Sequence, residues 1–411
     1  MIRDNYLDVS KIIKDKKILR LFKAVENYGG VLRFVGGCVR DAIMGIDSAD
    51  INLATDLSPD ELVEACEDRS LKTVAIGIKT DCIGVVINDS IIEVTSLHKI
   101  VTEGKQNIIQ FTTDWSVDAS SRDLTINAVY ADEKGNVFDY YNGIDDLENG
   151  VIRFIGNPNQ RIKEDYTRIL RFFRFYSSFG KGEPDKKSLQ ACIDNKEGLK
   201  TVSIDRLKDE LKKILLTKNV VNVMKIMADN DILSHVIPTP KNLSDLDFLV
   251  NWFDDSKIGK AGIRRLFMLL HANSKEQTEF YLNVLKFSNK GKAYYLSLDE
   301  ENIELSDYED SKKLLEIIYK YGNEFCIDKL IILCVKKRLK MANIEEIIQS
   351  IQEIKLPKFE VGGKDVIGFG VKNQQIKLVL NYLEALWIES GFTLSKEELI
   401  AKAETVSKEI A

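Results

Sequence analysis

The chain has 411 residues, with 58 Lys and Arg against 64 Asp and Glu, and a formal net charge of -6. Hydrophobic residues make up 44% and charged residues 30%, a composition that excludes a disordered chain. The length predicts two or three domains at about 150 residues each. No apolar run approaches the ~18 residues of a membrane span, and the N-terminus lacks a hydrophobic signal segment, so we expect a cytoplasmic protein.

The first third of the chain predicts a mixed α/β region. We expect a helix that is capped by Ser10 and stops at Gly29 and Gly30. Apolar or β-branched runs then predict strands at Val31–Val35, Asp50–Ala54, Thr73–Ile76, Cys82–Ile87 and Ile91–Leu97, with helices near Val39–Met44 and Pro59–Cys66. The last two strands are separated by only three residues, which predicts an antiparallel hairpin. The sheet should therefore be mixed and not doubly wound.

From about residue 160 onward the hydrophobic periodicity is helical almost everywhere. Only six prolines interrupt the chain, which also favours a mostly helical protein. Turn-forming clusters at Phe179–Asp185, Pro238–Ser244 and Pro357–Gly363 mark candidate boundaries. The predicted fold class is α+β, with a small mixed sheet first and helices afterwards. The six cysteines form no CxxC pair, so neither a zinc site nor a disulfide framework is expected.

The charge is distributed unevenly. Residues 1–150 hold 16 Lys and Arg and 26 Asp and Glu, whereas residues 151–220 hold 16 and 9, an excess of seven positive charges. The total charge argues mildly against a nucleic-acid partner, but a basic segment inside an acidic chain is what a local phosphate-binding surface looks like. A solvated helical face is the simpler interpretation of the excess alone.

The first motif is Gly36-Gly37-Cys38-Val39-Arg40-Asp41, at a predicted strand-to-helix turn. Glycines there allow backbone N–H groups to approach a phosphate closely, and the helix start favours negative charge. Arg40 can add a bidentate clamp. A plain turn between a strand and a helix is the competing interpretation.

The second motif is Asp50-Ile51-Asn52 on a predicted strand. Side chains at i and i+2 share one face, so positions 50 and 52 present two oxygens together. Paired carboxylates in this arrangement hold divalent metal ions, but Asn52 keeps only a carbonyl oxygen without the charge. Glu93, a lone acid among apolar strand residues, is a candidate third ligand or simply a solvent-facing residue.

Two further motifs follow. Ser121-Arg122-Asp123 through Asn127 predicts a helix opening with Asp123 near its start. The run from Glu164 to Phe175 contains Asp165, Arg168, Arg171 and Arg174. On one helix Asp165 and Arg168 would be neighbours, an acceptor beside a fork of donors that suits the edge of a base. A surface ion pair is the alternative.

In this order the four motifs resemble the class II nucleotidyltransferases, which are the bacterial tRNA CCA-adding enzymes and their poly(A) polymerase relatives. Segments at Phe111–Trp115, Asn142–Leu147, Ile204–Leu211 and Gly362–Phe392 resemble the family too. The resemblance implies a nucleotidyltransferase head at 1–150, a helical neck with the nucleotide-selecting motif at 151–236, and a tRNA-binding helical body and tail at 237–411. It implies addition of CMP and AMP from CTP and ATP to the 3′ end of tRNA.

The resemblance also assigns roles to residues of the motifs. Asp50, the residue at position 52 and Glu93 would be the catalytic ligands of Mg²⁺. The nucleotide would be bound by residues of the other three motifs: Gly36, Gly37 and Arg40 at the triphosphate, Arg122, Asp123 and Asn127 against the nucleotide and its ribose, Asp165 and Arg168 at the base, and Arg171 and Arg174 supporting the phosphates or the base pocket. The segment Val101–Gln106 falls where the family keeps a flexible loop that helps the change from CTP to ATP.

Two positions depart from the family pattern. Asn52 replaces a metal ligand, and Ser121 replaces the first arginine of the usual Arg-Arg-Asp. Asn52 therefore leaves open a non-catalytic tRNA-binding relative with a decayed metal site. An A-adding or CC-adding tRNA enzyme, or a poly(A) polymerase, would share the core motifs. No His-Asp dipeptide is present, so an appended phosphohydrolase domain is not expected.

Overall fold

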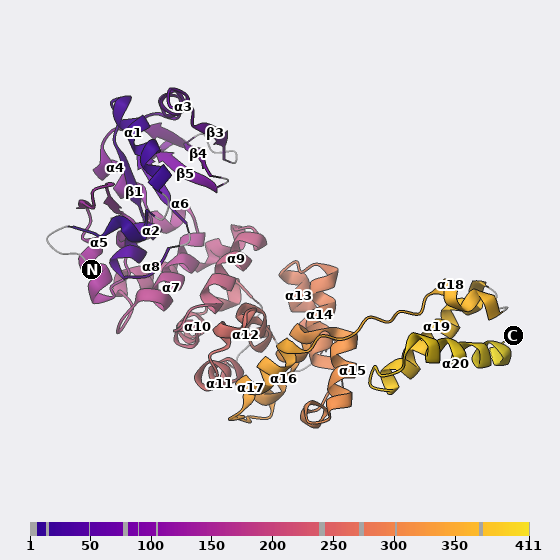
Figure 1. Ribbon diagram of the computed structural model, residues 1–411. Helices are drawn as coiled ribbons and strands as arrows, with labels where there is room; N and C mark the ends of the chain where they lie inside the picture. The colour runs from indigo at the N-terminus through magenta and orange to yellow at the C-terminus, as the bar shows by residue number, and fades with distance from the viewer. Residues whose placement is uncertain are drawn as a thin grey trace. The chain divides into compact units, whose positions relative to one another are not determined.

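The computed structural model describes residues 6–13, 16–48, 50–76, 81–88, 90–103, 106–237, 243–270, 275–300, 302–369 and 373–410. The chain forms two compact units, residues 1–241 and 242–411. The first contains the sheets and several helices, and the second is helical in its described part (Figure 1). The predicted border between head and neck at residue 150 falls inside the first unit and stays a prediction. In the described residues no helix is long and apolar enough to cross a membrane.

A seven-stranded sheet organises the first unit, in the order β3-β4-β5-β2-β1-β8-β9. Its strands are β1 (Leu32–Val35), β2 (Asn52–Thr55), β3 (Lys72–Ala75), β4 (Cys82–Ile87), β5 (Ser90–Ser96), β8 (Val129–Ala131) and β9 (Val137–Asp139). The pair β2–β5 is parallel and the other pairs are antiparallel, which confirms the predicted mixed sheet. The predicted hairpin is β4–β5.

A second, two-stranded sheet pairs β6 (His98–Glu103) with β7 (Gln106–Phe111). The sequence analysis expected a flexible loop at Val101–Gln106. Gly104 and Lys105, the central residues of that segment, lie outside the described residues. Most of the segment that was expected to be a loop is therefore strand in the described part of the chain.

Ten helices are described in the first unit. They are α1 (Leu19–Asn27), α2 (Gly37–Ile43), α3 (Pro59–Glu67), α4 (Trp115–Ser121), α5 (Gly143–Asn149), α6 (Pro158–Glu164), α7 (Thr167–Phe179), α8 (Lys186–Asp194), α9 (Ile204–Leu215) and α10 (Val220–Asp229). The first helix begins nine residues after Ser10, which lies in a 3₁₀ turn, so the predicted cap was wrong. Its predicted end is confirmed: Tyr28 is the C-cap, and Gly29 has φ +94°.

Two local predictions around the motifs were also wrong. Arg122 and Asp123 do not open a helix: α4 ends at Ser121, Arg122 is its C-cap with extended backbone, and Asp123 follows. Asp165 does not share a helix with Arg168, because the backbone of Asp165 is extended between α6 and α7. Both motifs therefore lie at helix ends, where side chains can point into a common space.

The second unit is an all-helical array over its described residues. Its helices are α11 (Ser244–Trp252), α12 (Ala261–Leu270), α13 (Lys275–Val284), α14 (Asn289–Glu300), α15 (Ser311–Tyr321), α16 (Asn323–Lys336), α17 (Ile344–Glu353), α18 (Gly363–Val366), α19 (Asn373–Glu389) and α20 (Lys396–Ile410). Residues 325–335 of α16 are buried throughout, so this helix forms the centre of its neighbourhood. A separate core around Trp387 joins α18, α19 and α20.

Candidate functional site

One large open cavity, of ≈1150 Å³, lies in the first unit. It is lined by the turn between β1 and α2, the end of α4, the turn before α7, and residues of α7 and α9. Of the predicted site residues, the cavity is lined by Gly36, Gly37, Arg40, Asn52, Arg122, Asp123, Asn127, Asp165, Arg168, Arg171 and Arg174. The other two, Asp50 and Glu93, are exposed and lie outside its lining.

The glycine turn supplies one wall. Gly36 is the N-cap residue of α2, with φ +71° and ψ -121°, a conformation that L side chains rarely adopt. A Cβ on Gly36 would lie 3.5 Å from the carbonyl oxygen of Asn127, and one on Gly37 would lie 3.8 Å from Arg40. The turn therefore needs glycine at position 36 for its backbone angle more than for space.

Arg40 is buried behind this turn. Its Nε and Nη2 donate to Oδ1 of Asp41 at 3.0 and 2.7 Å, and Nη1 donates to Oδ1 of Asn127 at 2.6 Å. The guanidinium also lies over the rings of Phe175 and Phe179, with centroids at 4.9 and 4.7 Å. Arg40 thus connects α2 to α7, and one hydrogen on each terminal nitrogen has no partner among the described residues.

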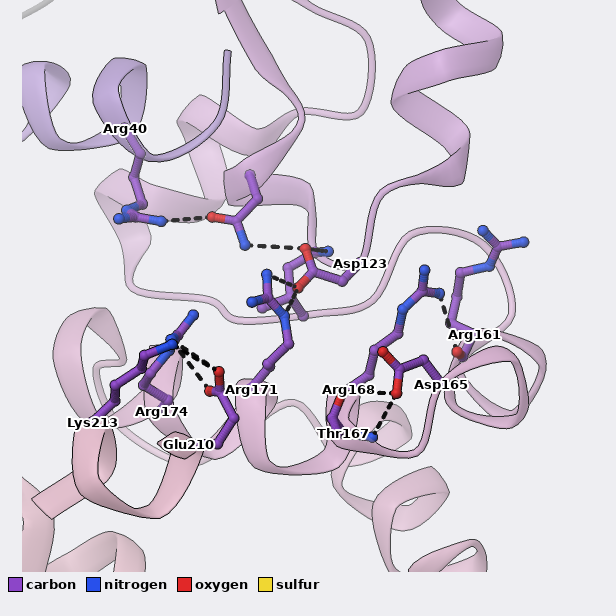
Figure 2. Close-up of polar contacts among 12 residues, drawn as sticks. Arg40, Asp123, Arg161, Asp165, Thr167, Arg168, Arg171, Arg174, Glu210 and Lys213 are labelled. Carbon is purple, nitrogen blue, oxygen red and sulfur yellow. Dashed lines mark hydrogen bonds and ion pairs between the residues drawn. The ribbon is translucent and has the colours of Figure 1, made fainter. Parts of the chain in front are cut away.

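A chain of polar contacts continues from Asn127 (Figure 2). The Asn127 amide donates to Oδ1 of Asp123 at 3.1 Å, and Arg171 donates to Oδ2 of Asp123 from Nε and Nη2, both at 2.6 Å. Burial alone would raise the pKa of Asp123, but the Arg171 charge and these hydrogen bonds lower it to about 2. Asp123 is therefore an ionised acceptor between the head strands and α7.

Asp165 lies in the turn between α6 and α7 and Arg168 lies in α7, and the two side chains bind different partners (Figure 2). Asp165 accepts from the amide and hydroxyl of Thr167 at 3.0 and 2.7 Å and from Nη2 of Arg206 at 2.7 Å. Burial would raise the pKa of Asp165, but these donors lower it. The surface ion pair between Asp165 and Arg168, the alternative interpretation, is not formed.

Arg168 instead bonds backward along the chain. Its Nη1 donates to Oε2 of Glu164 at 2.8 Å and to the carbonyl of Arg161 at 3.0 Å, and Nη2 donates to the carbonyl of Ser121 at 3.3 Å. Its Nε and one hydrogen of Nη2 have no partner among the described residues. An acceptor at Asp165 and a free donor edge at Arg168 therefore line the same cavity.

Helix α9 contributes residues to which the sequence analysis gave no role. Glu210 binds Nη1 of Arg174 at 3.2 Å and the ammonium of Lys213 at 3.3 Å, and Arg206 holds Asp165. Arg206 and Glu210 lie in Ile204–Leu211, a segment noted only for its resemblance to the family. Their charges, four positions apart on an amphipathic helix, were the available signal.

The charge of the cavity lining is positive. Its basic residues are Arg40, Arg122, Arg168, Arg171, Arg174, Arg206, Lys213 and Lys218, and its acidic residues are Asp41, Asp123, Asp165, Asp209 and Glu210. A positive concave surface with a glycine turn and unpaired arginine donors suits a polyanion such as a triphosphate.

Of the three candidate metal ligands, Asn52 lines this cavity, and Asp50 and Glu93 do not. Asn52 and Glu93 are directly opposite in the parallel pair β2–β5, so their side chains lie on one face of the sheet. Ala54 and Thr95, two residues further along the same strands, lie on that face as well. Asn52 and Thr95 line the cavity, whereas Glu93 is exposed and is not part of its lining. Asp50 precedes β2 by two residues.

These residues offer two carboxylates and an amide oxygen, a donor set of hard oxygens that fits a divalent cation. No group of three or more His, Cys, Asp or Glu residues close enough to hold a metal is present in the described chain. The three residues have the oxygen ligands that a divalent cation prefers, with one charge fewer than three carboxylates would give.

Family models match two segments of the chain. Residues 32–153 match the poly A polymerase head domain, and residues 183–243 match the model described as a probable RNA and SrmB-binding site of polymerase A. The first match contains the glycine turn and the strands of the head. The second contains α8, α9 and α10.

Full-length relatives extend the similarity. The chain is 32% identical over 400 residues to the mitochondrial CCA tRNA nucleotidyltransferase 1 of Mus musculus, covering 94% of this chain and 88% of the relative. It is 28% identical over 400 residues to the CCA-adding enzyme of Staphylococcus epidermidis, covering 92% and 95%. The solved Bacillus stearothermophilus CCA-adding enzyme in complex with CTP has the same fold, with a TM-score of 0.76 at 21% identity over 96% of this chain and 98% of that one. The chain belongs to the family of CCA-adding tRNA nucleotidyltransferases.

Proposed function

We propose that this protein adds CMP and AMP, taken from CTP and ATP, to the 3′ end of tRNA without a nucleic-acid template. The observation that carries the proposal is the single cavity that joins the Gly36–Arg40 turn to Asp165 and Arg168. A triphosphate site and a base-reading site in one cavity are what such an enzyme needs. The relatives named as CCA-adding enzymes support the same activity.

The base-reading part of the proposal rests on hydrogen-bond complementarity. Cytosine and adenine both present an amino donor beside a ring-nitrogen acceptor, whereas uracil and guanine present a carbonyl beside an N–H. Asp165 is an acceptor whose lowered pKa keeps it ionised, and Arg168 retains unpaired donors. Together they favour cytosine and adenine over uracil and guanine.

The phosphate part rests on the other cavity wall. Arg40 and Arg122, with the backbone of Gly36 and Gly37, face the space where a triphosphate would lie. Attack of the tRNA 3′-hydroxyl on the α-phosphate releases pyrophosphate, and the residues accelerate this transfer by orienting the nucleotide and offsetting its charge. Asp123 and Asn127 lie between the two walls, where they would hold the ribose.

The family uses a divalent metal, and we propose Mg²⁺ held by Asp50, the Asn52 carbonyl oxygen and Glu93. When bound, the cation would offset charge on the phosphates and lower the pKa of the attacking hydroxyl. Asn52 lacks the charge of a third carboxylate. We therefore expect this chain to bind Mg²⁺ more weakly, in the absence of nucleotide, than a chain with aspartate at position 52.

We propose that tRNA reaches the cavity along the basic segment 151–220, which includes α7, α8 and α9. Seven excess positive charges beside the nucleotide site suit the phosphates of an acceptor stem, which is recognised by shape more than by sequence. The Thermotoga maritima CCA-adding enzyme, whose structure is solved with tRNA, has the same fold as this chain, at 22% identity and a TM-score of 0.60. We further propose a cytoplasmic location and domain limits at residues 1–150, 151–236 and 237–411.

A second candidate is a non-catalytic tRNA-binding protein, favoured by Asn52. The contacts that hold Asp165 and the free donors of Arg168 argue against it, because base selection without transfer has no use. A poly(A) polymerase would share the match to the poly A polymerase head domain. The two relatives described above align with most of this chain, and they are named a CCA tRNA nucleotidyltransferase and a CCA-adding enzyme.

Three tRNA transcripts test these candidates: one ending before CCA, one ending at CC and one ending at CCA, each with labelled CTP or ATP and Mg²⁺. The proposal predicts that CTP labels the first, ATP labels the second and neither labels the third. Long A tails on all three would indicate a poly(A) polymerase, and products that stop at CC a CC-adding enzyme. No extension of any transcript would support the non-catalytic alternative.

A further inference from the structure

Helix α4 connects the β6–β7 hairpin to the nucleotide cavity, and one buried carboxylate lies at its centre. Asp118 is 1% exposed, and the described hydrogen bonds of its carboxylate all come from segments outside the helix or from the cap that ends it. The sequence analysis gave this residue no role. Its position between two functional segments makes its contacts informative.

The two carboxylate oxygens of Asp118 face different segments. Oδ1 accepts from the backbone N–H of His98, the first residue of β6, at 3.3 Å. Oδ2 accepts from Nε and Nη2 of Arg122 at 3.2 and 3.1 Å and from the hydroxyl of Tyr130 at 2.7 Å. Asp118 therefore ties the base of the hairpin to an arginine of the cavity.

These contacts fix the orientation of Arg122. With Nε and Nη2 turned toward Asp118, Nη1 lies 3.8 Å from the position a Cβ on Gly36 would take, at the glycine turn. Nη1 donates no hydrogen bond to any of the described residues. Burial would lower the pKa of Arg122, but the negative charge of Asp118 and the hydrogen bonds to Asp118 and Tyr130 raise it, so the guanidinium stays charged.

The C-terminal end of α4 is also held by two arginines from outside the helix. Nη1 of Arg161 donates to the carbonyl of Ser120 at 3.0 Å, and Nη2 of Arg168 donates to the carbonyl of Ser121 at 3.3 Å. The base-reading arginine and the helix that carries Asp118 therefore touch directly. A shift of α4 would move Arg122 and disturb Arg168 together.

We propose that Asp118 is a positioning residue that holds Arg122 toward the phosphates of the bound nucleotide and ties that arginine to the base of the β6–β7 hairpin. The inference rests on the proposed function, because it takes the ligand at the Gly36 turn to be a nucleoside triphosphate. Asp118 itself does not line the cavity and acts through Arg122.

Asp118→Asn tests this with little change in shape. In this variant the amide oxygen at position 118 can still accept from the His98 N–H, which keeps the contact with the hairpin. Its NH₂ group then faces the donors of Arg122, so the ion pair is lost. We expect the Kd for CTP and for ATP to rise about ten- to a hundredfold, with a smaller change in kcat at saturating nucleotide. Tyr130→Phe removes the hydroxyl that bonds both Asp118 and Arg122 but keeps the ion pair. This variant should raise both Kd values about threefold.

Asp114→Asn is the matched control, since Asp114 is the exposed N-cap of the same helix and Asn caps equally well. We expect its nucleotide Kd values to match those of the unmodified chain. Equal Kd values in the Asp118→Asn chain, or a loss of Tm and kcat with unchanged Kd, would overturn the proposal. If Asp118→Asn does not fold, an unchanged Kd in Tyr130→Phe would overturn it instead.

Equilibrium dialysis with CTP and ATP keeps the two hypotheses distinguishable. If the unmodified chain binds neither nucleotide, the proposed function fails and the role of Asp118 fails with it. If the unmodified chain binds both and Asp118→Asn binds them equally well, only the positioning role is wrong.

Discussion

Asp123 is the buried acid that joins the head strands to α7, through Asn127 on one side and Arg171 on the other. Its folded-state pKa of about 2 lies below its value in the unfolded chain, so it stabilises the fold above about pH 4. This contribution, about 2 kcal/mol, is lost as the pH falls from about 4 toward 2.

The corresponding experiment compares Asp123→Asn with the unmodified chain by urea denaturation at several pH values. At pH 6 the variant should be less stable by about 2 kcal/mol, and the difference should shrink as the pH falls through 4 toward 3. A difference that does not change with pH would mean that the ion pair with Arg171 does not set the pKa of Asp123.

Gly36 is required by its backbone, which has φ +71°. Gly36→Ala should destabilise the protein by about 1–2 kcal/mol, because alanine is strained in this conformation. The relaxed turn should also weaken CTP binding, measurable by isothermal titration. Gly182, which has φ +65° and nothing within 4 Å of an added Cβ, is the matched control. Gly182→Ala should cost similar stability and leave CTP binding unchanged.

Asn52 determines the charge of the candidate metal site. Asn52→Asp restores a third carboxylate opposite Glu93, and we expect Mn²⁺ affinity in the absence of nucleotide to rise about tenfold. Free Mn²⁺ measured by electron paramagnetic resonance gives this value without any assay of activity. Equal affinities in the two chains would show that position 52 does not contact the ion.

At the scale of elements, α9 supports the turn that carries Asp165. Arg206 is largely exposed, so its ion pair contributes under about 1 kcal/mol to stability, but it is one of the groups that orient Asp165. Arg206→Ala should lower the preference for CTP and ATP over UTP and GTP about three- to tenfold, measured as a ratio of kcat/KM. Lys212→Ala, an exposed change on the same helix, should keep the ratio, and a preserved ratio in both would refute this role.

Features of the fold that depend on neighbouring residues could be predicted from the sequence, whereas contacts between residues far apart in the chain could not. Alternation and turn residues located β2 and the β4–β5 hairpin within two residues, because those signals are local. The opposition of Asn52 and Glu93 depends on which strands pair, and a parallel register across forty residues leaves no local signal. The residue pattern left Glu93 as either a third ligand or a solvent-facing acid, and only the resemblance favoured the ligand.

The errors at the cavity have a common cause. Helical spacing made Asp165 and Arg168 neighbours, but α6 ends at Glu164 and the extended backbone of Asp165 turns its side chain to Arg206. The same kind of helix end separates Ser121 from Asp123. Eleven of the predicted site residues line one cavity and Asp50 and Glu93 do not, whereas the partners of these residues depend on tertiary contacts that periodicity does not encode.

At the scale of the molecule, the residues that line the cavity all belong to the first unit, and the second unit has its own buried polar network. Arg264, 1% exposed, binds Asp328 at 2.7 Å and Asp255 at 3.4 Å. Removing one member of a buried network leaves uncompensated charge, at a cost of about 3–5 kcal/mol. A substitution of Arg264 should therefore destabilise the second unit selectively.

Arg264→Met should unfold the second unit at lower urea concentration while CTP binding by the first unit persists. Arg338→Ala, which removes a partly exposed ion pair with Asp245 in the same unit, should cost under about 1 kcal/mol. Loss of CTP binding in step with the second unit's transition would contradict the independence of the two units.

The function proposed for this chain is to complete the 3′ end of tRNA with C, C and A. The most direct measurement is the intact mass of a tRNA that ends at the base before CCA, after incubation with the unmodified chain, Mg²⁺, CTP and ATP together. We predict one product heavier by two CMP residues and one AMP residue, and no further growth. An unchanged mass, or a ladder of added AMP residues, would contradict it.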